Sequence, residues 1–127
     1  NIQVRSAPYS NSKVDVMVPA QSSWNDLDTS AYAIATTIPK SSSGTFYYGY
    51  NSLPSSGTIY INYAMIWYSP DDVSLPVTGR TGCAMHEMLH CYGMGHTEYT
   101  NSMMYASYAY TNQTLTAYDL AEFSRMY

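Results

Sequence analysis

The alternation of hydrophobic and polar positions predicts strands in the first half of the chain. Short runs rich in β-branched and aromatic residues, bounded by Gly, Pro or Ser, are typical of strands. Such runs occur at Asn1–Arg5, Ala31–Ile38, Thr45–Ser52 and Thr58–Tyr68, and at least the first half of the last run is expected to be extended. The polar stretches between them are expected to be loops.

Apolar residues recur at helical spacing in three other places. Val14–Trp24 has this spacing, although a proline interrupts it. A longer helix is expected over Gly79–Tyr92 and ends at Gly93, because glycine suits the left-handed position after a helix. Thr116 and Asp119 form a capping-box pattern at the start of a last helix. Strand patterns come first and helical patterns last, so we expect an α+β domain.

Composition limits the classes of partner. The 127 residues suit one domain spanning 1–127, and 46% of them are hydrophobic, which is enough to build a core. The net charge is −4 with five Lys and Arg residues, so neither nucleic acid nor an anionic membrane is an expected partner. No apolar run approaches the ~20 residues of a membrane-spanning helix. A start at Asn1 rather than Met is expected of a processed, secreted domain.

The two cysteines, Cys83 and Cys91, fall in the same predicted helix. Eight residues of helix separate two Cα atoms by about 12 Å, whereas a disulfide tolerates at most about 7 Å. We therefore expect two small buried thiols, even though secreted chains often pair their cysteines.

All three histidines lie within one short span. His86 and His90 are four positions apart, so a helix places both imidazoles on one face, where they can hold one ion. His96 follows the glycine that ends the helix and supplies a third nitrogen, which leaves a fourth position open, as in catalytic zinc sites. Glu87 lies beside a ligand and is placed as a general base rather than as a ligand. The alternative, a closed structural zinc site, usually recruits four protein ligands and needs no base.

The motif H-E-x-x-H-x-x-G-x-x-H, from His86 to His96, is that of the metzincin metallopeptidases, and the chain resembles this family. The stretch "NSMMY" resembles their methionine turn, with Met104 expected beneath the zinc ligands and Met103 either in the core or partly exposed. A Met-Tyr pair eight residues after the third histidine, and Thr97 directly after it, resemble the matrixin (matrix-metalloproteinase-like) branch. The closing "LTAYDLAEFSRMY" resembles the last matrixin helix. The resemblance implies a twisted mixed β-sheet, an active-site helix, a C-terminal helix, and a zinc cleft between upper and lower parts.

The stretch "GTIYINYAMIW" has the length of the matrixin segment that helps to hold a structural zinc and calcium. Tyr60 stands at the histidine position of that segment, and Asn62, Tyr63, Ala64 and Met65 replace its acidic run. Because every histidine is already committed, we expect one catalytic zinc ion and no second one, and calcium is left open. The chain is shorter than a typical matrixin domain, so it resembles a short form of the family.

The resemblance implies a secreted, monomeric zinc endopeptidase that hydrolyses peptide bonds in extended protein or peptide substrates. Glu87 is expected to be the catalytic base, and Phe46–Asn51 is the candidate for the edge strand that pairs with substrate. The alternative is a zinc-containing peptide-binding module that is weakly active or inactive. The intact glutamate favours the enzyme, because a module that only binds peptides needs no base.

A pocket for the substrate side chain just after the cut is the last expectation from the resemblance. In matrixins this pocket lies beside the zinc, and a residue four positions before the first zinc histidine can narrow it. Gly82 stands there and has no side chain to close the floor. Ala106, Tyr108 and Tyr110 are expected to line the pocket, so we expect a preference for large apolar residues after the scissile bond.

Overall fold

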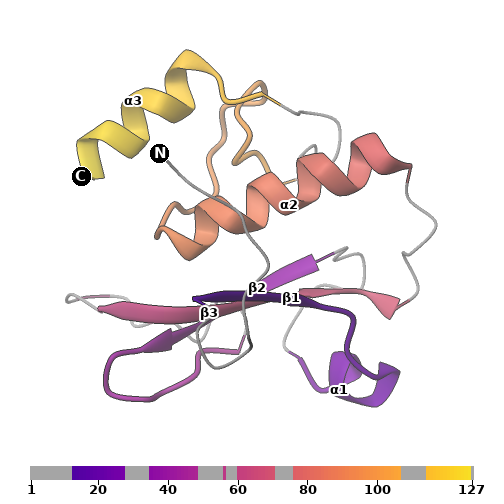
Figure 1. Cartoon of the computed structure of the whole chain (residues 1–127). Coiled ribbons are helices and arrows are strands. Elements are labelled where there is room, and N and C mark those ends of the chain that lie inside the picture. The colour runs from indigo at the N-terminus through magenta and orange to yellow at the C-terminus, as the bar shows by residue number, and fades with distance from the viewer. Residues whose placement is uncertain are drawn as a thin grey trace.

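The structure is a computed structural model that describes residues 13–27, 35–48, 56, 60–70, 76–106 and 114–126. The elements are β1 (Val14–Met17), α1 (Gln21–Asn25), β2 (Ala35–Ser41), β3 (Ile61–Tyr68), α2 (Val77–Cys91) and α3 (Ala117–Met126). Figure 1 shows α2 lying across one face of the sheet, α3 beyond α2, and the small helix α1 below the sheet. A mixed sheet with helices confirms the predicted α+β class.

The sheet has the strand order β1-β3-β2. β1 runs parallel to β3, with Val14 opposite Ala64, whereas β2 runs antiparallel to β3, with Ile38 opposite Met65. The central strand is covered by its two neighbours and by α2, so Ala64, Met65 and Ile66 are buried. Burial of these apolar side chains is the main contribution of the sheet to the core.

The strand predictions have different outcomes. The one over 58–68 is confirmed from Ile61, where β3 begins, and β3 extends through the whole second half of that run. The one over 31–38 is confirmed from residue 35, and β2 continues through Pro39 to Ser41. In the run at 45–52, Phe46 makes a single bridge to Lys40, and the run from residue 49 onward lies outside the described residues. The run at 1–5 lies outside them as well.

The helix predicted over Val14–Trp24 is wrong in its first half, where β1 forms instead. β-branched valines at alternate positions favour a strand, and β3 offers them a partner. Pro19 then separates this strand from α1, because proline cannot continue a helix from within. Only the end of the predicted segment, from Gln21 to the buried Trp24, is helical, and α1 continues to Asn25.

α2 confirms the helix predicted before Gly93. It begins at Val77 and ends at Cys91, and Gly93 has a φ of 87°, the left-handed conformation that glycine adopts readily. Its buried residues recur at helical spacing, and α2 packs against β2 and β3. Both cysteines are free, as expected, but only Cys83 is buried, whereas Cys91 at the end of α2 is half-buried. Burial raises the pKa of the Cys91 thiol to about 12, so this thiol is protonated at neutral pH.

After α2 the described chain continues as the segment 92–106, which contains neither helix nor strand. In Figure 1 its orange trace connects the end of α2 to the region of α3. Its methionines Met94, Met103 and Met104 pack with Leu89 of α2, and Phe123 of α3 packs against this cluster. The segment is therefore held by side-chain packing between the two helices rather than by a regular backbone ladder.

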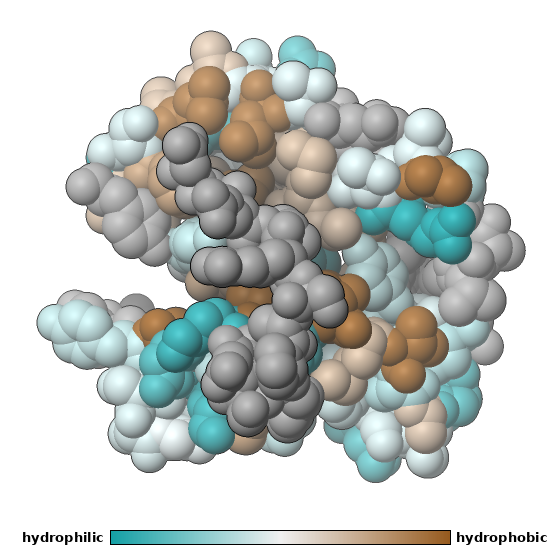
Figure 2. Space-filling model, viewed as in Figure 1, coloured by the Kyte–Doolittle hydropathy of each residue, from teal (hydrophilic) through white to brown (hydrophobic). Residues whose placement is uncertain are grey.

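α3 begins with the predicted capping box. The Thr116 amide donates to Asp119 Oδ2 at 2.8 Å, and the Asp119 amide donates to Thr116 Oγ1 at 3.2 Å. α3 exposes Leu120 and Met126, and Figure 2 shows apolar surface over the upper, helical part of the molecule. Among the described residues, none of the helices is long and apolar enough to cross a membrane.

Candidate metal centre

α2 brings two of the three histidines together. His86 and His90 lie one turn apart on the same side of the helix, and their Nε2 atoms are 3.0 Å apart. The ring of His86 is buried, whereas that of His90 is half-buried. The predicted pairing of these two imidazoles is thus present in the structure.

The third histidine arrives through a turn at the end of α2. The Gly93 amide donates to His90 O at 2.9 Å and the Met94 amide donates to Leu89 O at 3.1 Å, which reverses the chain after the helix. His96 then points its Nε2 atom at the other two rings, 3.2 Å from each of their Nε2 atoms. The three residues form a cluster that can hold a metal ion.

The geometry of the cluster fits zinc. Three ligand nitrogens at about 2.0–2.1 Å from a tetrahedral zinc lie about 3.3 Å from one another, close to the observed 3.0–3.2 Å. Three imidazoles also leave a fourth position for water or substrate. The cluster therefore has the donor set of a catalytic rather than a closed structural site.

Hydrogen bonds fix which nitrogens face the ion. His86 Nδ1 donates to Met103 O at 2.7 Å, and His90 Nδ1 donates to Met94 O at 2.6 Å. A carbonyl oxygen accepts only, so each Nδ1 carries the proton and each Nε2 presents a lone pair. Two lone pairs facing each other repel unless a cation lies between them. This arrangement favours a cluster that can hold a metal ion over a packed group of histidines.

Burial keeps the imidazoles neutral, as ligation requires. Burial, with smaller effects of the neighbouring His86 and His96, lowers the pKa of His90 to about 3. The pKa values of His86 and His96 are also lowered, in both cases mainly by burial. The three imidazoles are therefore neutral at neutral pH.

Glu87 lies beside the cluster but is not part of it. Its side chain is 5% exposed, and its carboxylate oxygen Oε2 accepts a hydrogen bond from Thr37 Oγ1 of β2 at 2.7 Å. Burial raises the pKa of the Glu87 carboxyl to about 7, although the hydrogen bond from Thr37 lowers it. A carboxyl group with this pKa can both take up and release a proton near neutral pH.

A turn over residues 102–105 lies against the first ligand and contains the predicted methionine. The Tyr105 amide donates to Ser102 O at 3.2 Å, and both Met103 and Met104 are fully buried. The carbonyl of Met103 contacts the His86 ring directly. Which methionine lies nearest to a bound ion stays a prediction.

Asp119 of α3 holds this turn in place. Its carboxylate accepts a short hydrogen bond from Ser102 Oγ and a second from the Met103 amide at 3.1 Å. Burial alone would raise the pKa of Asp119, but these bonds and those from Thr116 outweigh it and lower the pKa. The buried carboxylate therefore stays ionised, and it connects the start of α3 to the turn beside His86.

The proposed pocket residues are only partly described. Gly82 is buried in α2, and Ala106 is exposed at the end of the segment 92–106. Tyr108 and Tyr110 lie outside the described residues. The substrate pocket therefore stays a prediction.

Two functional contacts have no counterpart in the sequence analysis. Thr37 lies 50 positions before Glu87, and nothing in the strand pattern around it marks a link to the helix. Asp119 also accepts a hydrogen bond from the methionine turn. The sequence indicated only its role in the capping box at the start of α3.

Comparison with known proteins agrees with this geometry. Searches of curated proteins and of solved structures found no match to the chain. The model of one protein family, matrixin, matches residues 24–127. This range includes the strands β2 and β3, the helix α2, the methionine turn and the helix α3. With the histidine cluster in place, this match shows that the chain belongs to the matrixin family of metallopeptidases, as a short form.

Proposed function

We propose that this protein is a zinc-dependent endopeptidase that hydrolyses peptide bonds in extended protein or peptide substrates. The observation that carries the proposal is the convergence of three neutral imidazoles beside a buried carboxyl group whose pKa is about 7. A purely structural metal site would need neither an open fourth coordination position nor an adjacent carboxyl group. Membership of the matrixin family supports the same reaction class.

The ligands have distinct tasks in this reaction. His86, His90 and His96 would hold one zinc ion through their Nε2 atoms. When bound, zinc supplies a positive charge that acidifies water and stabilises negative charge on the oxygen of the scissile carbonyl. The carbonyls of Met103 and Met94 keep the rings of His86 and His90 in the tautomer that ligation needs.

Glu87 moves the proton. Its carboxylate takes a proton from the attacking water and then gives it to the amine that leaves when the C–N bond breaks. A pKa near 7 suits both halves of this task at neutral pH. The hydroxyl of Thr37 holds one carboxylate oxygen, so the other can face the substrate.

Substrate specificity forms the finer part of the proposal. An extended peptide would pair with an edge of the sheet, and the side chain after the cut would enter a pocket beside α2. Gly82 leaves room at its floor, with Ala106, Tyr108 and Tyr110 as the lining, so large apolar residues are preferred there. A secreted, monomeric enzyme fits the family and the low content of charged residues, which is 11%.

Digestion of a random peptide library, read by mass spectrometry, tests this proposal. We expect cleavage mainly before Leu, Phe or Tyr, loss of cleavage with a zinc chelator, and recovery after zinc is added back. Binding of library peptides without cleavage, at full zinc occupancy, would instead favour the inactive binding module. Cleavage mainly before Gly, Ala or charged residues would contradict the proposed pocket but not the reaction.

A further inference from the structure

The third zinc ligand is held differently from the other two. His86 and His90 are fixed by the backbone of α2, whereas His96 lies in the segment 92–106, which contains neither helix nor strand. A side chain on such a segment stays in place only if other contacts offset the conformational entropy lost on ordering it. The contacts of the residues next to His96 therefore help to keep its Nε2 atom close to the Nε2 atoms of His86 and His90.

Thr97, the residue after His96, makes three such contacts. Its amide donates to the carbonyl of Met104 in the methionine turn at 3.1 Å. Its hydroxyl oxygen accepts a bond from the Tyr99 amide at 3.2 Å and shares a hydrogen bond of 3.1 Å with the Tyr118 hydroxyl. Thr97 is thus tied to the methionine turn, to its own loop and to α3.

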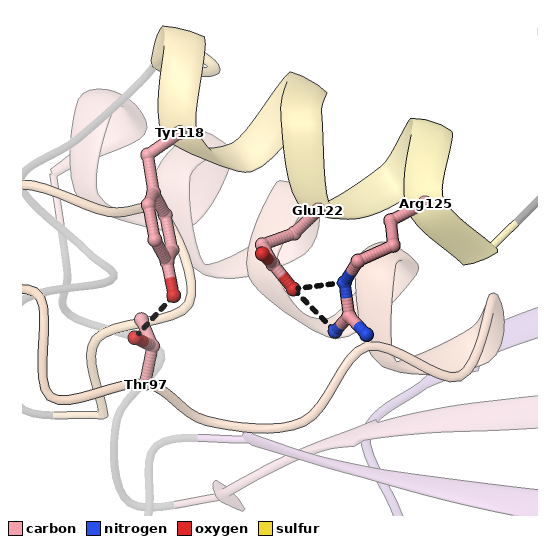
Figure 3. Close-up of polar contacts among 4 residues, drawn as sticks. All are labelled: Thr97, Tyr118, Glu122 and Arg125. Carbon is pink, nitrogen blue, oxygen red and sulfur yellow. Dashed lines mark hydrogen bonds and ion pairs between the residues drawn. The ribbon is translucent and has the colours of Figure 1, made fainter.

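Tyr118 is a well-anchored partner for this loop. It lies in the first turn of α3, next to Asp119, which connects that turn to the methionine turn. Its ring packs on the ring of Tyr99, with centroids 4.9 Å apart. Figure 3 shows the Tyr118 side chain extending from α3 to Thr97. The hydroxyl of Tyr118 is therefore presented to Thr97 by a fixed element.

The other polar side chains on this side of α3 are bonded within the helix. Arg125 and Glu122 form an ion pair of 2.7 Å, also drawn in Figure 3, and the arginine side chain is 74% exposed. Exposed pairs at this spacing contribute little to stability. Tyr118, Glu122 and Arg125 line a cavity of about 280 Å³. His96 and Thr97 line the same cavity. Within this group, the hydrogen bond that reaches across from α3 to the His96 segment comes from Tyr118.

We propose that Tyr118 is a positioning residue for the third zinc ligand. Its hydroxyl holds Thr97, and Thr97 holds His96 so that Nε2 lies within 3.2 Å of the other two ligand nitrogens. Tyr118 is not one of the three residues of the ligand cluster. The inference rests on the proposed zinc site and adds a residue on which its affinity depends.

The effect has a bounded size. Loss of a group that bonds directly to a ligand ring typically weakens metal binding 10–100-fold. Tyr118 acts one residue further away through a partly exposed bond, so Tyr118→Phe should raise the zinc dissociation constant about 3–10-fold. The phenylalanine keeps the ring that packs on Tyr99, so the fold of the zinc-free protein should be unaffected.

Competition with a chromogenic chelator at one pH measures this on the full chain. Tyr118→Phe is compared with Thr97→Val, which removes the partner hydroxyl, and with Thr97→Ser, which keeps it. Tyr60→Phe, at a side chain 75% exposed before β3, is the control for loss of a tyrosine hydroxyl and should bind zinc like the wild type. The thermal midpoint of each zinc-free variant is measured alongside.

The expected pattern is specific to positioning. Tyr118→Phe and Thr97→Val weaken zinc binding, Thr97→Ser restores most of it, and the double variant is no weaker than Thr97→Val alone. Zinc affinity unchanged in Tyr118→Phe, or additive losses in the double variant, would overturn the positioning role while leaving the proposed function intact. A wild-type chain that binds no zinc would overturn both.

Discussion

Thr37 and Glu87 are joined across the interface between the sheet and α2. Thr37 Oγ1 lies 2.7 Å from the carboxylate oxygen Oε2 of Glu87 and 2.9 Å from its backbone oxygen. The two residues are 50 positions apart, so this contact exists only in the folded chain. It connects strand β2 to the residue expected to carry the proton.

Removal of this hydroxyl should reduce catalysis. In Thr37→Val the buried Glu87 carboxylate loses the hydroxyl that donates to Oε2. We expect kcat to fall about tenfold and the free energy of unfolding to fall by about 1–3 kcal/mol. Thr37→Ser keeps the hydroxyl and serves as the matched control. Peptide hydrolysis at matched zinc content, with urea unfolding, checks both effects. Equal kcat values for the Val and Ser variants would rule out an orienting role for the hydroxyl.

The histidine cluster was predictable from the sequence because its arrangement is largely local. A spacing of four on a helix sets His86 beside His90, and a glycine with positive φ turns the chain so that His96 can join them. The contact between Thr37 and Glu87 was not predictable, since it depends on how α2 packs on β2. No residue near Thr37 in sequence signals that packing.

The fold was predictable to a similar extent. α2 and the capped start of α3 follow from helical spacing and end signals. The strand β1 was mistaken for helix, because Val14–Met17 is short and its partner β3 lies 50 residues further along the chain. A strand pairing of this kind is tertiary information, which outweighs local periodicity.

Asp119→Asn tests the link between α3 and the methionine turn. The buried carboxylate accepts bonds from Ser102, from the Met103 amide and from Thr116, and asparagine replaces one acceptor oxygen with a donor. We expect a loss of about 2–4 kcal/mol in urea unfolding. Glu122→Gln, on the same helix but in an exposed ion pair, should change stability by less than about 0.5 kcal/mol. Equal losses for the two variants would contradict a special role for Asp119.

Stability of the zinc-free protein should depend on pH through Glu87. Burial raises its pKa from 4.5 to about 7, so the folded state favours the protonated form. The contribution of Glu87 to the free energy of unfolding is fully present below pH 4.5. It is lost as the pH rises through 7. Glu87→Gln removes the dependence, so its advantage over wild type should grow by up to about 3 kcal/mol between pH 5 and 8. Urea unfolding in the presence of a chelator measures the difference in the free energy of unfolding between the two proteins. A difference that did not change with pH would argue against a buried Glu87 carboxyl with a raised pKa.

Zinc affinity should respond weakly to mild acid. Three imidazoles with the ordinary pKa of 6.5 would lose roughly 60-fold in zinc affinity between pH 8 and 6, because protons compete for each nitrogen. Burial lowers the pKa of all three ligands here, so we expect a loss of less than about fivefold. Chelator competition at the two pH values distinguishes these cases. A loss near 60-fold would mean that the rings are solvated in the zinc-free protein.

The most direct test of the proposed reaction compares wild type with Glu87→Gln on one cleaved peptide, with zinc content measured in the same samples. Glu87 is not a ligand in the cluster, so the variant should retain one zinc ion per chain. Loss of the base should lower kcat by about 10²–10⁴-fold. A variant that holds a full equivalent of zinc and cleaves at the wild-type rate would show that Glu87 does not carry the proton.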